Sequence, residues 1–100
     1  YLIVDKNGAQ NDGEVDKILS LDTGATLVKK IESFGWEVFE IDGHNEDEIL
    51  SCFNKRLNKP VAIVANTVKG KGVSFMETYE WHAKAPNDEE YKKAIMELES

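Results

Sequence analysis

The chain has 100 residues, of which 41% are hydrophobic and 31% are charged, and its formal net charge at pH 7 is −7. This length allows one domain at most, and the hydrophobic content suffices for a core, which argues against a disordered chain. The acidic balance argues against a general nucleic-acid binder, and no apolar run approaches the roughly 18 residues of a membrane span.

The first half of the sequence predicts two strands with a helix between them. Residues 1–4 form a continuous apolar run, typical of a strand that is covered on both faces. A polar stretch over 5–13 follows, and residues 15–19 suggest a short helical turn. The spacing of apolar residues over 26–34 predicts a helix, and residues 36–41 predict the second strand. Because the chain begins inside an expected strand, we expect it to be cut from a longer protein.

The second half predicts a helix, a central strand, a long loop and a last helix. Asn45 is an expected N-cap for a helix that ends near Leu57, where the single cysteine, Cys52, lies in the apolar pattern and should be buried. Residues 61–65 are apolar throughout, as in a central parallel strand, and Asn87 caps the last helix. This order predicts an α/β fold with a mostly parallel sheet and flanking helices.

Ligands in open parallel sheets bind beyond the carboxyl ends of the strands, and three loops leave those ends, at residues 5–13, 42–45 and 66–85. In the first loop, Asn7 and nearby backbone carbonyls offer oxygen atoms, which suit Mg²⁺. Composition alone favours a simpler interpretation, a turn that is held by Asx hydrogen bonds.

The third loop carries cationic side chains beside glycines. Lys69 and Lys71 could attract a phosphate, but their spacing does not match a Walker motif and from spacing alone indicates a solvated basic turn. His82 lies between an aromatic residue and a lysine, where a proton shuttle or phosphate donor would be placed, although a lone histidine is more often structural. His44 follows the second strand and is interpreted as part of a turn.

Five stretches of the sequence resemble the transketolase family, from end to end and in order. They are residues 3–8, 35–38, 40–44, 67–76 and 81–88. The resemblance implies the second half of a thiamine diphosphate-binding domain, close to the small split-subunit form, so that 1–100 is a partial domain. The first half, with its Gly-Asp-Gly motif, should lie before Tyr1.

The resemblance also implies the residues of the site. Asn7 would bind Mg²⁺ (or Ca²⁺ or Mn²⁺) through its side chain, and Ala9 through its backbone carbonyl. Lys69 and His82 would reach the diphosphate. His82 would also face the sugar substrate, where it could stabilise a hydroxyl or shuttle a proton. Asp5, although acidic, is not expected to be a ligand.

The implied reaction transfers a two-carbon ketol unit from a ketose phosphate to an aldose phosphate, as in the pentose phosphate pathway. The glutamate that activates the cofactor belongs to another domain in this family, so this chain alone is expected to be inactive. Its expected partners are the remaining transketolase domains or a C-terminal subunit, in a homodimer or heterotetramer. A single cysteine and the lack of a signal peptide pattern lead us to expect a cytoplasmic protein.

Two departures from the family pattern leave other functions open. Ala83 stands where glycine is usual, and the stretch over 10–13 is less apolar than in most members, so substrate preference could differ. The alternatives within the superfamily are a deoxyxylulose-phosphate synthase and a sulfosugar transketolase. The alternative outside it is a non-enzymatic flavodoxin-like binding module, with Asp5 and Asp42 near strand ends, although the long third loop does not fit that module.

Overall fold

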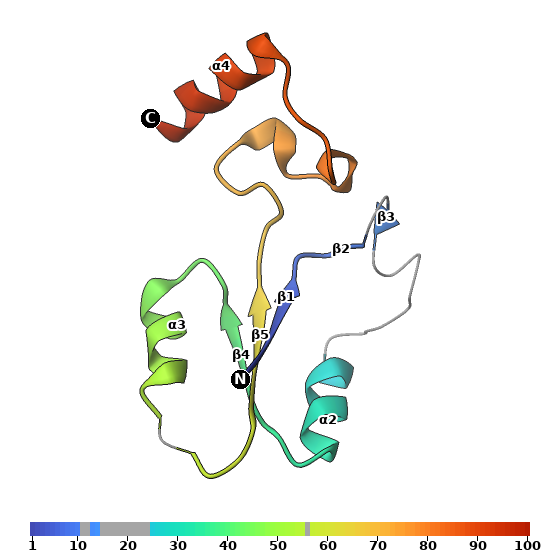
Figure 1. The fold of residues 1–100 in the computed structure, drawn as a ribbon, viewed down its shortest axis with the longest axis vertical. Helices are drawn as coiled ribbons and strands as arrows, with labels where there is room; N and C mark the ends of the chain where they lie inside the picture. The colour runs from blue at the N-terminus through green and yellow to red at the C-terminus, as the bar shows by residue number, and fades with distance from the viewer. Residues whose placement is uncertain (11–12, 15–24, 56) are drawn as a thin grey trace.

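The computed structural model describes residues 1–10, 13–14, 25–55 and 57–100. A three-stranded parallel sheet lies at its centre, with the strand order β1-β5-β4 (Figure 1). The strands are β1 (Leu2–Lys6), β4 (Glu37–Asp42) and β5 (Val61–Asn66). The α/β fold with a parallel sheet is therefore confirmed.

Helices and short elements complete the described chain. The helices are α2 (Ala25–Ser33), α3 (Glu46–Phe53) and α4 (Asp88–Leu98), with two 3-10 helices, η1 (Ser74–Met76) and η2 (Tyr79–Trp81), and a small antiparallel pair, β2 (Ala9–Gln10) and β3 (Gly13–Glu14). Both α2 and α3 pack against β4, and Figure 1 shows them on opposite sides of the sheet. The helical turn expected over 15–19 lies outside the described residues.

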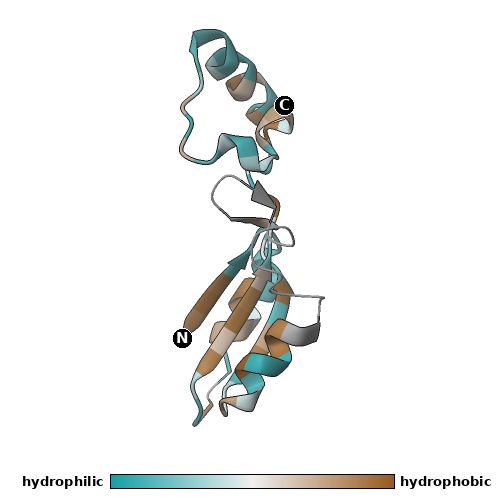
Figure 2. Cartoon of the chain, turned by 90° about the vertical axis from the view of Figure 1, so that its right-hand side faces the viewer, coloured by the Kyte–Doolittle hydropathy of each residue, from teal (hydrophilic) through white to brown (hydrophobic). Residues whose placement is uncertain are grey.

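The core forms around β5, as its uninterrupted apolar sequence predicts. Ala62 and Val64 are fully buried, and Val61 and Ile63 are nearly so. Cys52 of α3 packs into the same core and is 2% exposed, which confirms the prediction of a buried thiol. Figure 2 shows hydrophobic residues along the strands and on parts of the helices.

The expectation that residues 1–4 are covered on both faces is wrong for this structure. Tyr1 is 67% exposed and Ile3 is 62% exposed. The reason is that β1 is an edge strand beside β5, whereas the described helices of the sheet, α2 and α3, pack on β4. An apolar run indicates a strand that can be buried, but not which elements cover it.

Helix α3 ends four residues before the end that its apolar periodicity predicts. Asn54 is its C-cap, and the backbone N–H of Asn54 donates to the carbonyl of Leu50 at 3.2 Å. Asparagine is a weak helix former that favours helix ends, and this local effect outweighs the continued apolar spacing to Leu57. The N-cap is confirmed, since Asn45 accepts from the N–H groups of Asp47 and Glu48.

Beyond β5 the chain leaves the sheet and forms an arm of η1, η2 and α4 past the carboxyl ends of the strands (Figure 1). Within this arm, Glu97 joins α4 to η1. Its carboxylate accepts from the N–H of Ser74 at 2.5 Å and from the hydroxyl of Ser74 at 2.9 Å. Across the part of the chain that the structure describes, no helix is long and apolar enough to span a bilayer.

Candidate functional site

The carboxyl ends of the three parallel strands meet at one edge of the sheet. Asn66 at the end of β5 pairs in register with Lys6 of β1 and with Asp42 of β4. The N–H of Thr67 donates to the carbonyl of Lys6 at 3.2 Å, which continues the pairing beyond the strands. The three loops that the sequence singled out therefore leave the sheet side by side.

Asn7 forms the turn that follows β1. Its Oδ1 accepts from the N–H of Ala9 at 2.9 Å, and Gly8 between them has a φ of 72°, a region that favours glycine. The Asx turn that composition favoured is thus present. A side-chain carbonyl oxygen has two lone pairs, and Ala9 occupies only one of them. The turn is therefore compatible with a second role for Oδ1 as a metal ligand.

Asp5 fixes the direction of this amide. Its Oδ2 accepts from Nδ2 of Asn7 at 3.2 Å, and its Oδ1 accepts a short hydrogen bond from the hydroxyl of Thr67. The amide nitrogen of Asn7 therefore faces Asp5, and its oxygen faces the Ala9 side of the turn. Both carboxylate oxygens of Asp5 have protein partners in this arrangement.

Lys69 lies on a tight turn after β5. The N–H of Lys71 donates to the carbonyl of Val68 at 3.2 Å, and Gly70 has a φ of 67°. A Cβ at Gly70 would collide with the backbone carbonyl of Met76, so the turn is pressed against η1. The turn also contacts the loop after β4, where Nε2 of His44 accepts from the N–H of Val68 at 2.8 Å.

A cavity of about 420 Å³ opens between these loops. It is lined by Asn7, Gly8, Ala9, Thr67, Val68, Lys69, Glu77, Thr78 and Tyr79. This volume lies within the range of small-molecule sites. The structure thus brings together Asn7, Ala9 and Lys69, three of the four residues that the sequence assigned to the site.

The lining combines neutral oxygen atoms, one glycine, one cation and one carboxylate. The carboxylate is that of Glu77, whose Oε1 accepts from the N–H of Gly72 at 3.3 Å. Among the described residues, no group of three or more His, Cys, Asp or Glu side chains is placed to hold a metal ion. The oxygen atoms that the described lining offers to a metal ion are therefore mainly side-chain amide and backbone carbonyl oxygens.

His82 is exposed and is not among the described residues that line this cavity. Its N–H donates to the carbonyl of Tyr79 at 3.0 Å, so it closes η2. Beside it, the ring of Trp81 packs against Phe75 with centroids 5.4 Å apart, and Nζ of Lys84 lies 4.0 Å from the Trp81 centroid. The backbone on both sides of His82 is therefore anchored, while its side chain is accessible.

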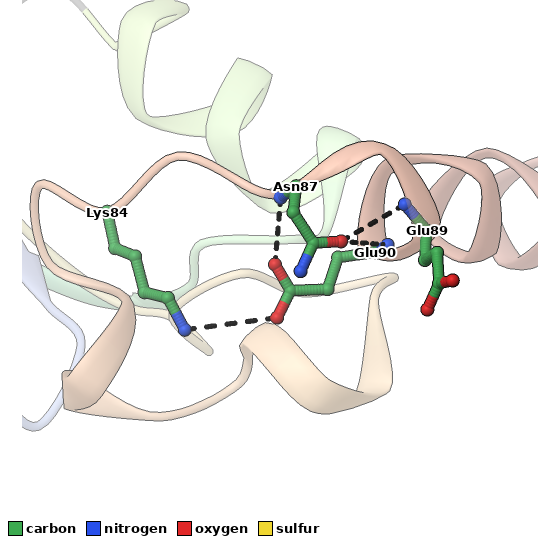
Figure 3. Close-up of polar contacts among 4 residues, drawn as sticks. All are labelled: Lys84, Asn87, Glu89 and Glu90. Carbon is green, nitrogen blue, oxygen red and sulfur yellow. Dashed lines mark hydrogen bonds and ion pairs between the residues drawn. The ribbon is translucent and has the colours of Figure 1, made fainter.

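The segment after His82 is tied to the start of α4 (Figure 3). Nζ of Lys84 lies 3.9 Å from Oε1 of Glu90, and Oε2 of Glu90 accepts from the N–H of Asn87 at 2.9 Å. The Asn87 side chain accepts in return from the N–H groups of Glu89 and Glu90, which completes the predicted cap as a capping box.

Sequence reasoning missed several residues of the cavity wall. Thr67, Thr78 and Tyr79 line it without belonging to a recognisable ligand pattern. The position of Thr67 directly after a central parallel strand was the available signal, because the carboxyl edge of such a strand is where ligands bind. Thr78 and Tyr79 reach the cavity only because the arm folds back, which no local pattern indicates.

Curated transketolase proteins are similar to most of the chain, although no family model matches it. An apulose-4-phosphate transketolase subunit of Phocaeicola vulgatus is 33% identical over 96% of this chain, and a 6-deoxy-6-sulfo-D-fructose transketolase subunit of a Clostridium species is 41% identical over 95%. The human transketolase is 36% identical over 72% of this chain. The chain spans 34% and 35% of the two subunits and 12% of the human protein.

Proposed function

Because this chain belongs to the transketolase family, we propose that it forms part of the thiamine diphosphate-binding domain of a ketol-transferring enzyme. Residues 1–100 would supply the second half of that domain, with the first half before Tyr1 in the complete protein. The observation that carries the proposal is that Asn7, Ala9 and Lys69 line one cavity at the carboxyl edge of a parallel sheet.

The donors on one wall of the cavity fit a hard divalent cation. Oδ1 of Asn7 and the backbone carbonyl of Ala9 would hold Mg²⁺, or Ca²⁺ or Mn²⁺ in its place, because such ions prefer oxygen ligands. Two neutral donors leave the charge of the ion available to the diphosphate. Asp5 would contribute by holding the Asn7 amide rather than by binding the ion.

Lys69 supplies positive charge to the same cavity, and the glycines that follow it would allow backbone N–H groups to approach a phosphate. The contribution of these groups would be to position and neutralise the diphosphate. When bound, thiamine diphosphate supplies the carbanion and the electron sink for transfer of a two-carbon ketol unit. The substrates would be a ketose phosphate and an aldose phosphate.

His82 would serve the substrate side of the site and contact the outer part of the diphosphate. Its accessible imidazole, on backbone that is anchored by Trp81 and Lys84, could stabilise a sugar hydroxyl or shuttle a proton. We expect His82→Ala to lower the transfer rate more than the affinity for thiamine diphosphate.

The catalytic unit would include a partner. Two relatives are named as transketolase subunits, which supports a separate partner chain. The remaining transketolase domains could also be fused to this chain and provide the same contribution. The glutamate that activates the cofactor would come from that partner, in a cytoplasmic homodimer or heterotetramer. This chain alone would then be inactive, and the pentose phosphate pathway would be its setting.

A second candidate function is transfer from a modified sugar. The relative at 41% identity is named for a 6-deoxy-6-sulfo sugar, and another relative is named for apulose-4-phosphate. Assays of the complete enzyme with ordinary sugar phosphates and with each modified sugar would separate the two candidates.

The proposed cofactor site can be tested on the complete protein with its partner. Asn7→Ala should weaken Mg²⁺-dependent binding of thiamine diphosphate on the order of 100-fold, and Lys69→Ala by about tenfold, while both variants stay folded. Isothermal titration calorimetry measures the affinity, and circular dichroism checks the fold. An unchanged affinity in both variants would contradict the proposal.

A further inference from the structure

We propose that His44 is a positioning residue for Lys69, and that its neutral imidazole holds the turn on which Lys69 reaches the cavity. The observation is the hydrogen bond of 2.8 Å from the N–H of Val68 to Nε2 of His44. The two residues come from different loops, 24 positions apart in the sequence. The inference rests on the proposed function, because Lys69 matters there as the cation at the diphosphate.

The loop that carries His44 is itself fixed against the end of β5. The N–H of Gly43 donates to the carbonyl of Asn66 at 2.8 Å. A Cβ at Gly43 would lie 3.0 Å from the Cβ of Ala65 and would collide with the methyl group of Thr67. Only glycine allows this close approach, so the loop is pressed against the segment that leads to the Lys69 turn.

His44 is also fixed within its own loop. Its N–H donates to Oδ1 of Asp42 at 2.9 Å, and the N–H of Asp42 donates to Oε2 of Glu48 at 2.8 Å. The N–H of Asn45 donates to the carbonyl of Asp42 at 3.1 Å. The imidazole therefore projects from a rigid turn rather than from a free loop.

The position of the Val68 backbone depends on hydrogen bonds more than on burial of its side chain. Its side chain is 42% exposed, so packing restrains it weakly. Its N–H is bound by His44, and its carbonyl accepts from the N–H of Lys71 at 3.2 Å. The backbone of Lys69 lies between these two anchors, and loss of the His44 bond would release one of them.

The hydrogen bond from Val68 requires one tautomer of the neutral His44 imidazole. Nε2 accepts, so it carries no proton, and the neutral ring carries its proton on Nδ1. A glutamine at this position can offer Oε1 as an acceptor, whereas phenylalanine keeps the ring shape and has no acceptor. This pair of variants separates the hydrogen bond from the packing of the ring.

The test is a double-mutant cycle on the complete protein, with the affinity for thiamine diphosphate in Mg²⁺ measured by calorimetry. His44→Phe should weaken binding about fivefold, the value of one lost hydrogen bond. His44→Gln should stay within about twofold of the native protein if its amide replaces that bond. In a Lys69→Ala background, His44→Phe should cause no further loss.

Two outcomes overturn this inference. One is an unchanged affinity in His44→Phe, and the other is an equal loss from His44→Phe with and without Lys69. If His44→Phe fails to fold by circular dichroism, His44→Asn replaces it in the cycle, because its shorter amide cannot reach Val68. A failure of the proposed function would look different, since Asn7→Ala and Lys69→Ala would then bind thiamine diphosphate like the native protein.

Discussion

The hydroxyl of Thr67 donates a hydrogen bond to the carboxylate of Asp5, and this bond joins the ends of two neighbouring parallel strands. The same carboxylate accepts from Nδ2 of Asn7 at 3.2 Å, and Oδ1 of Asn7 accepts from the N–H of Ala9 at 2.9 Å. A chain of hydrogen bonds thus runs from the end of β5 to the proposed metal ligands. Its consequence is that the Asn7 amide has one direction in the site.

Removal of the Asp5 carboxylate should therefore impair the metal site without removing a ligand. We expect Asp5→Ala to weaken Mg²⁺-dependent binding of thiamine diphosphate roughly tenfold, as is typical when the partner of a metal ligand is lost. Asp47→Ala, which removes the same charge from the exposed first turn of α3, is the control and should leave the affinity unchanged. Equal affinities of the two variants in calorimetry would show that Asp5 does not orient the site.

Ala83 adopts a backbone conformation that favours glycine, with a φ of 56°. An L-residue with a Cβ is strained there by about 1 kcal/mol. We expect Ala83→Gly to raise the free energy of unfolding by up to about 1 kcal/mol, because it removes this strain. Ala85→Gly, two residues on without a positive φ, should lower it through the entropy of the unfolded chain. The opposite signs can be read from urea denaturation, and a lower stability of Ala83→Gly would contradict the strain.

Gly70 needs both its positive φ and the space that a missing side chain leaves. Gly35 is a matched control, since its φ is 85° and a Cβ there would meet no atom within 4 Å. Gly35→Ala should cost about 1 kcal/mol of unfolding free energy from backbone strain alone. Gly70→Ala should cost about 2 kcal/mol or more, because its Cβ would also collide with the Met76 carbonyl. If the two variants lose the same stability, the turn is not held against η1.

The Glu97 carboxylate should give the arm a pH dependence. Hydrogen bonds from the N–H and then the hydroxyl of Ser74 hold the pKa of Glu97 below its ordinary value of 4.5. A pKa lowered by folding adds stability that is present above 4.5 and is lost as the pH falls through the folded value. Thermal unfolding from pH 7 to pH 3 should therefore show that the native protein loses its advantage over Glu97→Gln in acid. A constant difference across this range would exclude the linkage.

The sequence predicted those features whose causes are local. The uninterrupted apolar run of β5 made it the central strand, and Asn45 and Asn87 cap helices because their side chains bind N–H groups two and three residues away. The end of α3 was predicted too late, because the apolar spacing continues past Asn54 and hides a weak helix former. The exposure of β1 could not be predicted, because it depends on which elements cover the sheet.

The candidate site likewise contains residues that the sequence predicted and contacts that it could not predict. Asn7, Ala9 and Lys69 were predicted through the family resemblance, and they line the same cavity. The contact of His44 with Val68 was missed, because it depends on the packing of two loops that are distant in sequence. His82 lies outside the cavity among the described residues, and its role stays a prediction.

We propose that this fold holds thiamine diphosphate through a divalent cation on Asn7 and Ala9. The most direct test is a calorimetric titration of thiamine diphosphate into the complete protein, once with Mg²⁺ and once with excess chelator. We expect tight binding with Mg²⁺ and a large loss of affinity in chelator. Equal affinity under the two conditions would contradict it.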